Sequence, residues 1–183
     1  MNFIGISGSL RKESYNTKLL LAAAQCLPDG LTLRVISCGD LPLYNNDLDG
    51  EIKPESVSRL LRAIKESDGL LIATPEYNYS IPGVLKNAID WASRPGYKSV
   101  LAGKPAAIIS GTQSVIGGAR VQLHLRDVLS STLTPVVPSP PFLVPLVQEK
   151  FNQDGELVDE ETVRRLDRYV KDLIQWVDRL ADQ

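Results

Sequence analysis

The feature that most constrains the fold is a regular alternation of short apolar runs with longer segments of helical spacing. Four runs have the length and composition of strands, namely NFIGIS, LTLRVIS, DGLLIATP and KPAAIISGT, and a helical pattern follows each of them. A connection between parallel strands needs a crossover of about a dozen residues or more, usually a helix. The alternation therefore predicts a doubly wound α/β fold with a parallel sheet.

The helical segments are amphipathic, as expected of helices that cover a sheet. In ESVSRLLRAIKE, for example, Val57, Leu60 and Ile64 recur at the helical spacing. The run DGLLIATP is apolar throughout, which is typical of a strand with helices on both sides. In chain order we expect strands at 2–7, 31–37, 68–75 and 104–112, an edge strand in the proline-broken stretch 134–144, and helices at 15–27, 55–66, 82–93, 117–131 and about 159–181.

Composition and charge narrow the class of protein. The formal net charge of −2 provides no basic face for nucleic acid. No run approaches the ~18 apolar residues of a membrane span, and the start MNFIGISGS lacks the basic flank and apolar length of a signal peptide. Cys26 and Cys38 form neither a CxxC nor a metal-binding spacing. We expect a single domain over 1–183, cytoplasmic, with reduced thiols, no metal and no membrane insertion.

Three loops rich in polar and small residues follow the first, third and fourth predicted strands: GSLRKESYN, PEYNYSIPG and SGTQSVIGG. In a parallel doubly wound sheet, ligands lie beyond the carboxyl ends of the strands. The three loops are therefore expected to converge on one ligand site.

The first loop has the composition of a phosphate site. It ends where a helix begins, and the free N–H groups at a helix start attract anions. Ser9, Ser14 and Asn16 can donate hydrogen bonds, and Arg11 adds a charged planar fork. Because the chain lacks G-x-x-x-x-G-K-[ST] and G-x-G-x-x-G, the loop suits a mononucleotide phosphate that is held without being cleaved. The alternative is an ordinary loop in which Ser14 or Asn16 only caps the helix.

The second and third loops suit a planar ring. Residues 75–83 combine two prolines and a glycine with Tyr77 and Tyr79. Such a loop is stiff, its backbone N–H groups can reach ring acceptors, and a tyrosine can flank the ring face. In the third loop, small residues such as Gly111 let a ring approach the backbone. Taken alone, the two loops could also be a plain turn and a glycine-rich connection.

No residue set for protein-based catalysis stands out. His124, the single histidine, lies in a helical pattern beside apolar neighbours and is interpreted as structural. Glu76 could be a base but has no visible partner, and Asp47, Asp49 and Glu51 are interpreted as a solvated acidic loop. A chain that can bind a ring and a phosphate but has no nucleophile indicates that a bound cofactor carries the chemistry.

The segments GSLRKESYN, TPEYNYSIPGVLKNAIDWASR and VIGGARVQLHLRDVL closely resemble the NAD(P)H-dependent FMN reductase family, in particular its bacterial quinone and chromate reductases. The resemblance covers nearly the whole chain. It implies a flavodoxin-like α/β fold, a five-stranded parallel sheet of order 2-1-3-4-5 with helices on both faces. It also implies non-covalent FMN, NADPH or NADH as electron donor, quinones as acceptors with chromate, azo dyes or nitro compounds as adventitious ones, and a homodimer or homotetramer.

Carried over by position, the resemblance assigns cofactor contacts to twelve residues: Ser9, Arg11, Ser14, Tyr15, Asn16, Pro75, Glu76, Tyr77, Asn78, Tyr79, Gly111 and Thr112. It places Arg120 on the nicotinamide or subunit side, and it implies no catalytic protein residue. The chain departs from the family pattern at Ser114, where many relatives have glycine. It also departs at the proline-rich stretch 135–146, where a more acidic segment is expected.

Two functions of other classes stay open alongside the reductase. A flavodoxin-type electron carrier would share the fold but lack nicotinamide turnover, and such carriers are typically far more acidic than a net charge of −2. A regulatory flavin sensor would need a partner surface, and no segment of the sequence marks one.

Overall fold

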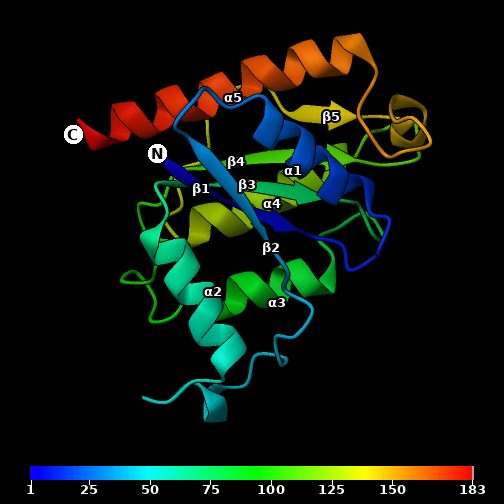
Figure 1. Ribbon diagram of the computed structural model, residues 1–183. Helices are drawn as coiled ribbons and strands as arrows, with labels where there is room; N and C mark the ends of the chain where they lie inside the picture. The colour runs from blue at the N-terminus through cyan, green and yellow to red at the C-terminus, as the bar shows by residue number, and fades with distance from the viewer. Residues whose placement is uncertain (183) are drawn as a thin grey trace.

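Five strands form one parallel sheet: β1 (Asn2–Ser7), β2 (Thr32–Ile36), β3 (Gly69–Thr74), β4 (Ala106–Gly111) and β5 (Phe142–Val144). Their spatial order is β2-β1-β3-β4-β5, and every neighbouring pair is parallel (Figure 1). The structure is a computed structural model that describes residues 1–182. The expected strand order and direction are confirmed.

Five helices cover both faces of the sheet: α1 (Tyr15–Gln25), α2 (Glu55–Glu66), α3 (Gly83–Ala92), α4 (Ala119–Ser131) and α5 (Glu160–Ala181). In Figure 1, α1 and α5 lie on the upper side of the sheet and α2 and α3 on the lower side. Two short 3₁₀ helices, η1 (Asn46–Leu48) and η2 (Val147–Lys150), lie in connections. Within residues 1–182, no helix is both long and apolar enough to span a bilayer.

The sheet separates two hydrophobic cores because alternate side chains of a strand point to opposite faces. On β1, Phe3 packs in the core formed with α1 and α5, whereas Ile4 and Ile6 pack in the core formed with α2, α3 and α4. All residues of β3 and β4 are buried. Their apolar runs therefore reflect burial on both faces, as expected for a parallel sheet.

The largest differences from the sequence-based expectations lie at the C-terminal edge of the sheet. Instead of a strand through 134–144, only Phe142–Val144 pairs with β4, and Val136 forms an isolated parallel bridge with Ala106. Pro138, Pro140 and Pro141 lie between these contacts, and a proline has no N–H to donate to a ladder. The helix expected at 15–27 ends at Gln25, because the residue before Pro28 is disfavoured in helical geometry.

The long connection between β2 and α2 is tied to α3. The side chains of Asn87 and Trp91 both donate to the carbonyl of Pro42, at 3.0 and 2.8 Å. In the same connection Asp49 is not solvated, contrary to the interpretation from sequence: it pairs with Lys53 and, at 3.6 Å, with Arg94. These ion pairs lower the pKa of Asp49, chiefly through the hydrogen bond from Lys53. Asp49 is therefore a packed structural residue, whereas Asp47 and Glu51 are exposed, as the interpretation from sequence expects.

Candidate functional site

A cleft opens at the carboxyl edge of the sheet, where the loops after β1, β3 and β4 converge. We call it the ligand cleft, and it is lined by Ser9, Arg11, Ser14, Tyr15, Asn16, Pro75, Glu76, Tyr77, Gly111, Thr112, Gln113 and Val147. Ten of the twelve predicted site residues line it, and Asn78 and Tyr79 do not. Sequence reasoning missed Gln113, which lies in the quoted third loop, and Val147, which begins η2 and belongs to no motif.

The first loop presents several hydrogen-bond donors around the start of α1. Ser14 is the N-cap, and its hydroxyl oxygen accepts from the Thr17 N–H at 3.3 Å. The capping alternative is therefore correct for Ser14, yet its hydroxyl proton stays free to donate. Ser9 likewise accepts from the Arg11 N–H at 3.3 Å through its hydroxyl oxygen and keeps its proton. The guanidinium of Arg11 is exposed and forms no ion pair with residues 1–182. Hydroxyls, a guanidinium and helix N–H groups together form an anion-binding surface.

Asn16 joins the first loop to the third. Its side-chain amide donates to the carbonyl of Gly111 at 2.9 Å, and the Gly111 N–H donates back to its Oδ1, also at 2.9 Å. The side chain is 4% exposed. Each end of the amide thus has a partner within the protein. The second Nδ2 hydrogen and the backbone N–H of Asn16 stay available to a ligand.

The second loop contains a tight turn closed by two backbone hydrogen bonds between Tyr77 and Ser80, at 3.1 and 3.0 Å. Its two central residues, Asn78 and Tyr79, have φ angles of 49° and 64°. Positive φ at both central positions defines the type I′ turn, which asparagine tolerates and tyrosine rarely adopts. The Tyr79 ring lies 4.2 Å from the Arg120 guanidinium, measured to the ring centroid. This contact directs Tyr79 toward α4 and away from the ligand cleft.

Glu76 caps α4. Its carboxylate accepts from the backbone N–H groups of Arg120 and Val121, at 3.0 and 3.1 Å, and from the Arg120 guanidinium at 3.3 Å. The N-cap residue, Gly118, has no side chain to serve these groups. A carboxylate at a helix N-terminus is favourable because the N–H groups carry partial positive charge. Glu76 is therefore a structural cap. Its partner, which the sequence did not reveal, is the start of α4.

His124 contacts the same turn. It is exposed on α4, and its Nδ1 lies 3.0 Å from the Ser80 hydroxyl. Glu76, Tyr79 and Ser80 thus all contact α4, through Arg120, Val121 and His124. The role remains structural: α4 holds the second loop in place.

The third loop is closely packed. A β-carbon on Gly111 would lie 2.9 Å from Leu19 Cδ1 and 3.0 Å from Val147 Cγ2, so a larger residue does not fit without movement. Ser114 braces the loop, because its hydroxyl lies 3.1 Å from that of Thr112 and accepts from the Ile116 N–H at 3.4 Å. The Ser114 hydroxyl therefore holds the loop in shape through contacts within it.

The thiols are not placed for redox chemistry. Cys26 and Cys38 are both free, and burial raises the pKa of the Cys38 thiol to about 11, so that it stays protonated at neutral pH. Among residues 1–182, no three His, Cys, Asp or Glu side chains are grouped to hold a metal ion. The cleft therefore combines anion-binding donors with a close-packed backbone and no activated protein nucleophile.

Known proteins resemble this chain over nearly its whole length. The chain is 41% identical over 177 residues to an NAD(P)H-dependent FMN reductase of Pseudomonas aeruginosa, covering 97% of this chain and 95% of the relative. It is 40% identical over 172 residues to a 2-hydroxy-1,4-benzoquinone reductase of a Burkholderia species, covering 94% and 93%. The solved structure of FerB, a flavoenzyme NAD(P)H:(acceptor) oxidoreductase from Paracoccus denitrificans, superposes with a TM-score of 0.86, with 39% identity and 97% of each chain covered.

A doubly wound sheet of order 2-1-3-4-5, with a cleft at its carboxyl edge beside a helix start, is typical of the class of flavodoxin-like proteins. Within that class, the family model for NADPH-dependent FMN reductase matches residues 1–149. The chain belongs to this family of oxidoreductases, whose cofactor is FMN and whose electron donor is NAD(P)H.

Proposed function

We propose that this chain is an FMN-dependent NAD(P)H oxidoreductase that passes two electrons to quinones. The observation that carries the proposal is one cleft with two kinds of lining. Ser9, Arg11 and Ser14 line it at the start of α1, and the close-packed Gly111 lines it from the third loop. The relatives support the acceptor class, because the Burkholderia enzyme is named a benzoquinone reductase. Chromate, azo dyes and nitro compounds are further acceptors that an open cleft over a flavin would admit.

The lining of the ligand cleft fits the two ends of FMN. The free hydroxyl protons of Ser9 and Ser14, the Arg11 guanidinium and the N–H groups of Tyr15 and Asn16 would hold the phosphate. The loops at Pro75–Tyr77 and Gly111–Thr112 would hold the ribityl and ring, chiefly through their backbone, since the side chains of Glu76 and Asn16 have partners within the protein. Asn78 and Tyr79 would act indirectly, by shaping the second loop.

Bound FMN would supply the redox chemistry, hydride uptake from NAD(P)H and transfer of two electrons to the acceptor. The residues of this chain contribute position and charge: Arg11 and the start of α1 offset negative charge in the cleft, and the tethered loops fix the ring plane. Nicotinamide and acceptor would take turns in the same cleft, which predicts ping-pong kinetics.

Two measurements on the purified protein test the proposal. Its absorbance spectrum should show flavin bands, and denaturation should release FMN. NADPH should then be consumed with benzoquinone as acceptor. A yellow FMN-bound protein without NAD(P)H consumption would instead support the flavodoxin-type carrier.

Replacing Arg11 with alanine should weaken FMN binding by about 1–3 kcal/mol, the range for a charge-assisted hydrogen bond. Titration of the apoprotein with FMN, followed by quenching of flavin fluorescence, measures the change. Lys12→Ala is the matched control, because Lys12 is an exposed neighbouring cation that does not line the cleft. Equal FMN affinity in the Arg11 and Lys12 variants would remove Arg11 from the site.

Replacing His124 with alanine should leave quinone turnover within about threefold and lower the free energy of unfolding by about 1 kcal/mol or less, because one exposed hydrogen bond is lost. The turn keeps its two backbone hydrogen bonds. Steady-state assays and urea unfolding measure both effects. A collapse of turnover in a folded variant would show that His124 takes part in the reaction.

We also propose a cytoplasmic homodimer or homotetramer with FMN near a subunit interface. Large apolar side chains are exposed around the cleft side of the chain, among them Tyr77 and Tyr79 in the second loop and Val115 and Ile116 in the third. Exposed apolar groups of this kind are typical of association surfaces. Analytical ultracentrifugation of the FMN-bound protein gives the stoichiometry.

A further inference from the structure

The ligand cleft has one carboxylate in its lining. Of the lining residues given above, all within residues 1–182, Glu76 alone is acidic and Arg11 alone is basic. Arg11 belongs to the first loop, which we assign to the phosphate, whereas Glu76 belongs to the second loop, which we assign to the ribityl and ring. Hydride uptake adds a unit of negative charge to a flavin. A carboxylate in the second loop therefore opposes reduction of the ring unless a positive charge offsets it.

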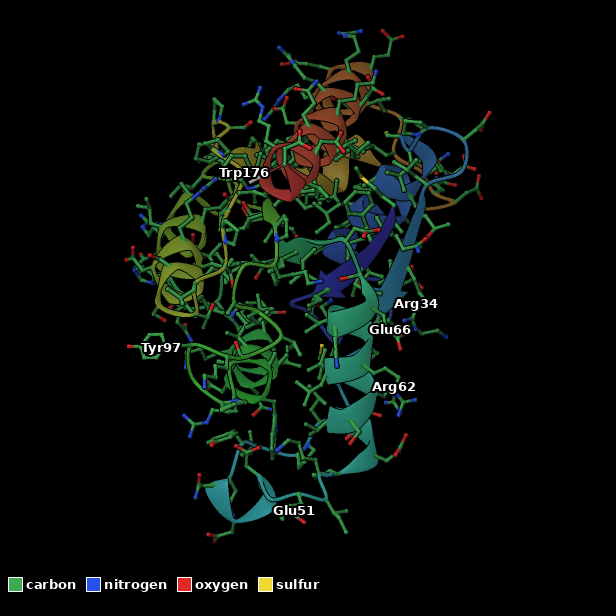
Figure 2. The ribbon with its side chains drawn as sticks, turned by 90° about the vertical axis from the view of Figure 1, so that its left-hand side faces the viewer. Arg34, Glu51, Arg62, Glu66, Tyr97 and Trp176 are labelled. Atoms are coloured by element: carbon green, nitrogen blue, oxygen red, sulfur yellow. The ribbon has the colours of Figure 1, made fainter. Side chains whose placement is uncertain are left out.

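Solvent does little to screen the charge of Glu76. Charged side chains elsewhere extend from the surface, as Figure 2 shows for Arg62 and Glu66 of α2, and salt weakens the field of such exposed groups. The Glu76 side chain is only 10% exposed. It accepts from two backbone N–H groups at the start of α4, and a helix start carries about half a positive charge. The helix therefore offsets only part of the negative charge.

Arg120 provides the remaining positive charge. Its guanidinium lies 3.3 Å from Glu76 Oε1 and 4.2 Å from the centroid of the Tyr79 ring, so it is held from two sides. Within residues 1–182, Arg120 forms no ion pair with any other carboxylate. Arg120 does not line the ligand cleft. It is thus a cation outside the cleft that is paired with the one carboxylate inside it.

We infer that Arg120 raises the reduction potential of bound FMN by neutralising Glu76. This inference rests on the proposed function, because it needs FMN in the ligand cleft. A second loop without net charge favours reduced FMN, which carries the added negative charge, over oxidised FMN. If Arg120 only held the loop in shape, its loss would weaken both redox states of FMN alike and leave the potential unchanged.

Arg120→Gln tests the inference, because it removes the charge and keeps a polar side chain. Reduced FMN should bind about tenfold more weakly relative to oxidised FMN, the lower end of what a neighbouring charge does to a titrating group. For a two-electron couple, tenfold corresponds to a midpoint potential lower by about 30 mV. Equilibrium reduction against reference dyes, followed by absorbance, measures the potential.

Two variants control for charge and for position. Arg120→Lys keeps the charge, so its ratio of reduced to oxidised FMN affinity should stay within about threefold of that of the unmodified protein. Arg164→Gln breaks an ion pair with Glu160 that is also 3.3 Å long but lies exposed on α5. It should leave the potential unchanged.

Removal of the carboxylate should act in the opposite direction. Glu76→Gln should raise the potential by a similar amount, and the double variant Glu76→Gln/Arg120→Gln should return to within about threefold of the original affinity ratio. If Arg120→Gln alone does not retain FMN, the comparison of Glu76→Gln with the double variant decides. A lower potential in the double variant supports the inference, and equal potentials overturn it.

Two further results would contradict the role of Arg120. One is an Arg120→Gln variant with the same potential as the Arg164→Gln control. The other is an Arg120→Lys variant that loses as much as Arg120→Gln, because the charge would then not be the cause. FMN uptake by the unmodified protein, read from its flavin absorbance, reports on the proposed function separately.

Discussion

Replacing Asn16 with leucine will lower the free energy of unfolding by about 2–6 kcal/mol, because it leaves two buried backbone groups of Gly111 without partners at about 1–3 kcal/mol each. Both hydrogen bonds are 2.9 Å long, and Asn16 is 4% exposed. Leucine has the same number and branching of side-chain heavy atoms as asparagine, so the loss reports mainly on the amide. Urea unfolding of the apoprotein, followed by circular dichroism, measures it.

Two further variants sharpen this test. Asn46→Leu changes an exposed asparagine of η1 and should stay within about 0.5 kcal/mol of the original protein. Asn16→Asp keeps an acceptor for the Gly111 N–H but loses the donor to the Gly111 carbonyl, so it should also be destabilised. If Asn16→Leu costs no more than Asn46→Leu, the bridge between the first and third loops does not stabilise the fold.

Replacing Gly118 with alanine will destabilise the protein by about 2–4 kcal/mol, of which about 1–2 comes from the left-handed backbone alone. Gly118 has φ 87°, and an added β-carbon would lie 2.8 Å from Ser110 Cβ and 2.9 Å from its Oγ. Ser110 is fully buried in β4, and its hydroxyl donates to the Gly117 carbonyl at 2.8 Å, so it has little room to move. Thermal and urea unfolding measure the loss.

The same substitution should reach the ligand cleft. A displaced α4 would no longer present the N–H groups of Arg120 and Val121 to Glu76, so FMN retention should fall together with stability. Gly50→Ala is the matched control, because no heavy atom lies within 4 Å of an added β-carbon there and its φ is not positive. Equal stability of the two alanine variants would contradict the packing argument at Gly118.

The parallel sheet could be predicted from sequence because its strands and helices depend on local properties, whereas the strand order follows from the family resemblance. Apolar runs such as that of β3 record burial on both faces, and parallel strands require the intervening helices. The convergence of the three loops follows from the same reasoning, because parallel strands place their carboxyl ends at one edge. For this reason the three loops could be named in advance, and the family resemblance supplied most of their lining residues. Val147 follows the short strand β5 and belongs to no recognisable motif.

The contacts of individual polar side chains could not be predicted, because their partners are distant in the sequence. Glu76 caps a helix 44 residues further on, and Asn16 bonds a glycine 95 residues away. From composition, both residues are equally suited to a ligand or to the protein itself. The ion pairs of Asp49 could not be predicted either. An acidic stretch indicates solvated carboxylates, and only the structure shows that Lys53 and Arg94 pair with this one.

The bridge between Asn16 and Gly111 also bears on how the cofactor arrives. Because the first and third loops are joined by protein groups, and the second is fastened to α4, the cleft is preorganised before any flavin enters. FMN binding therefore does not carry the entropic cost of ordering these loops. As a result, more of the free energy of each contact contributes to affinity. The apoprotein should accordingly be a folded species that loses and regains its cofactor reversibly.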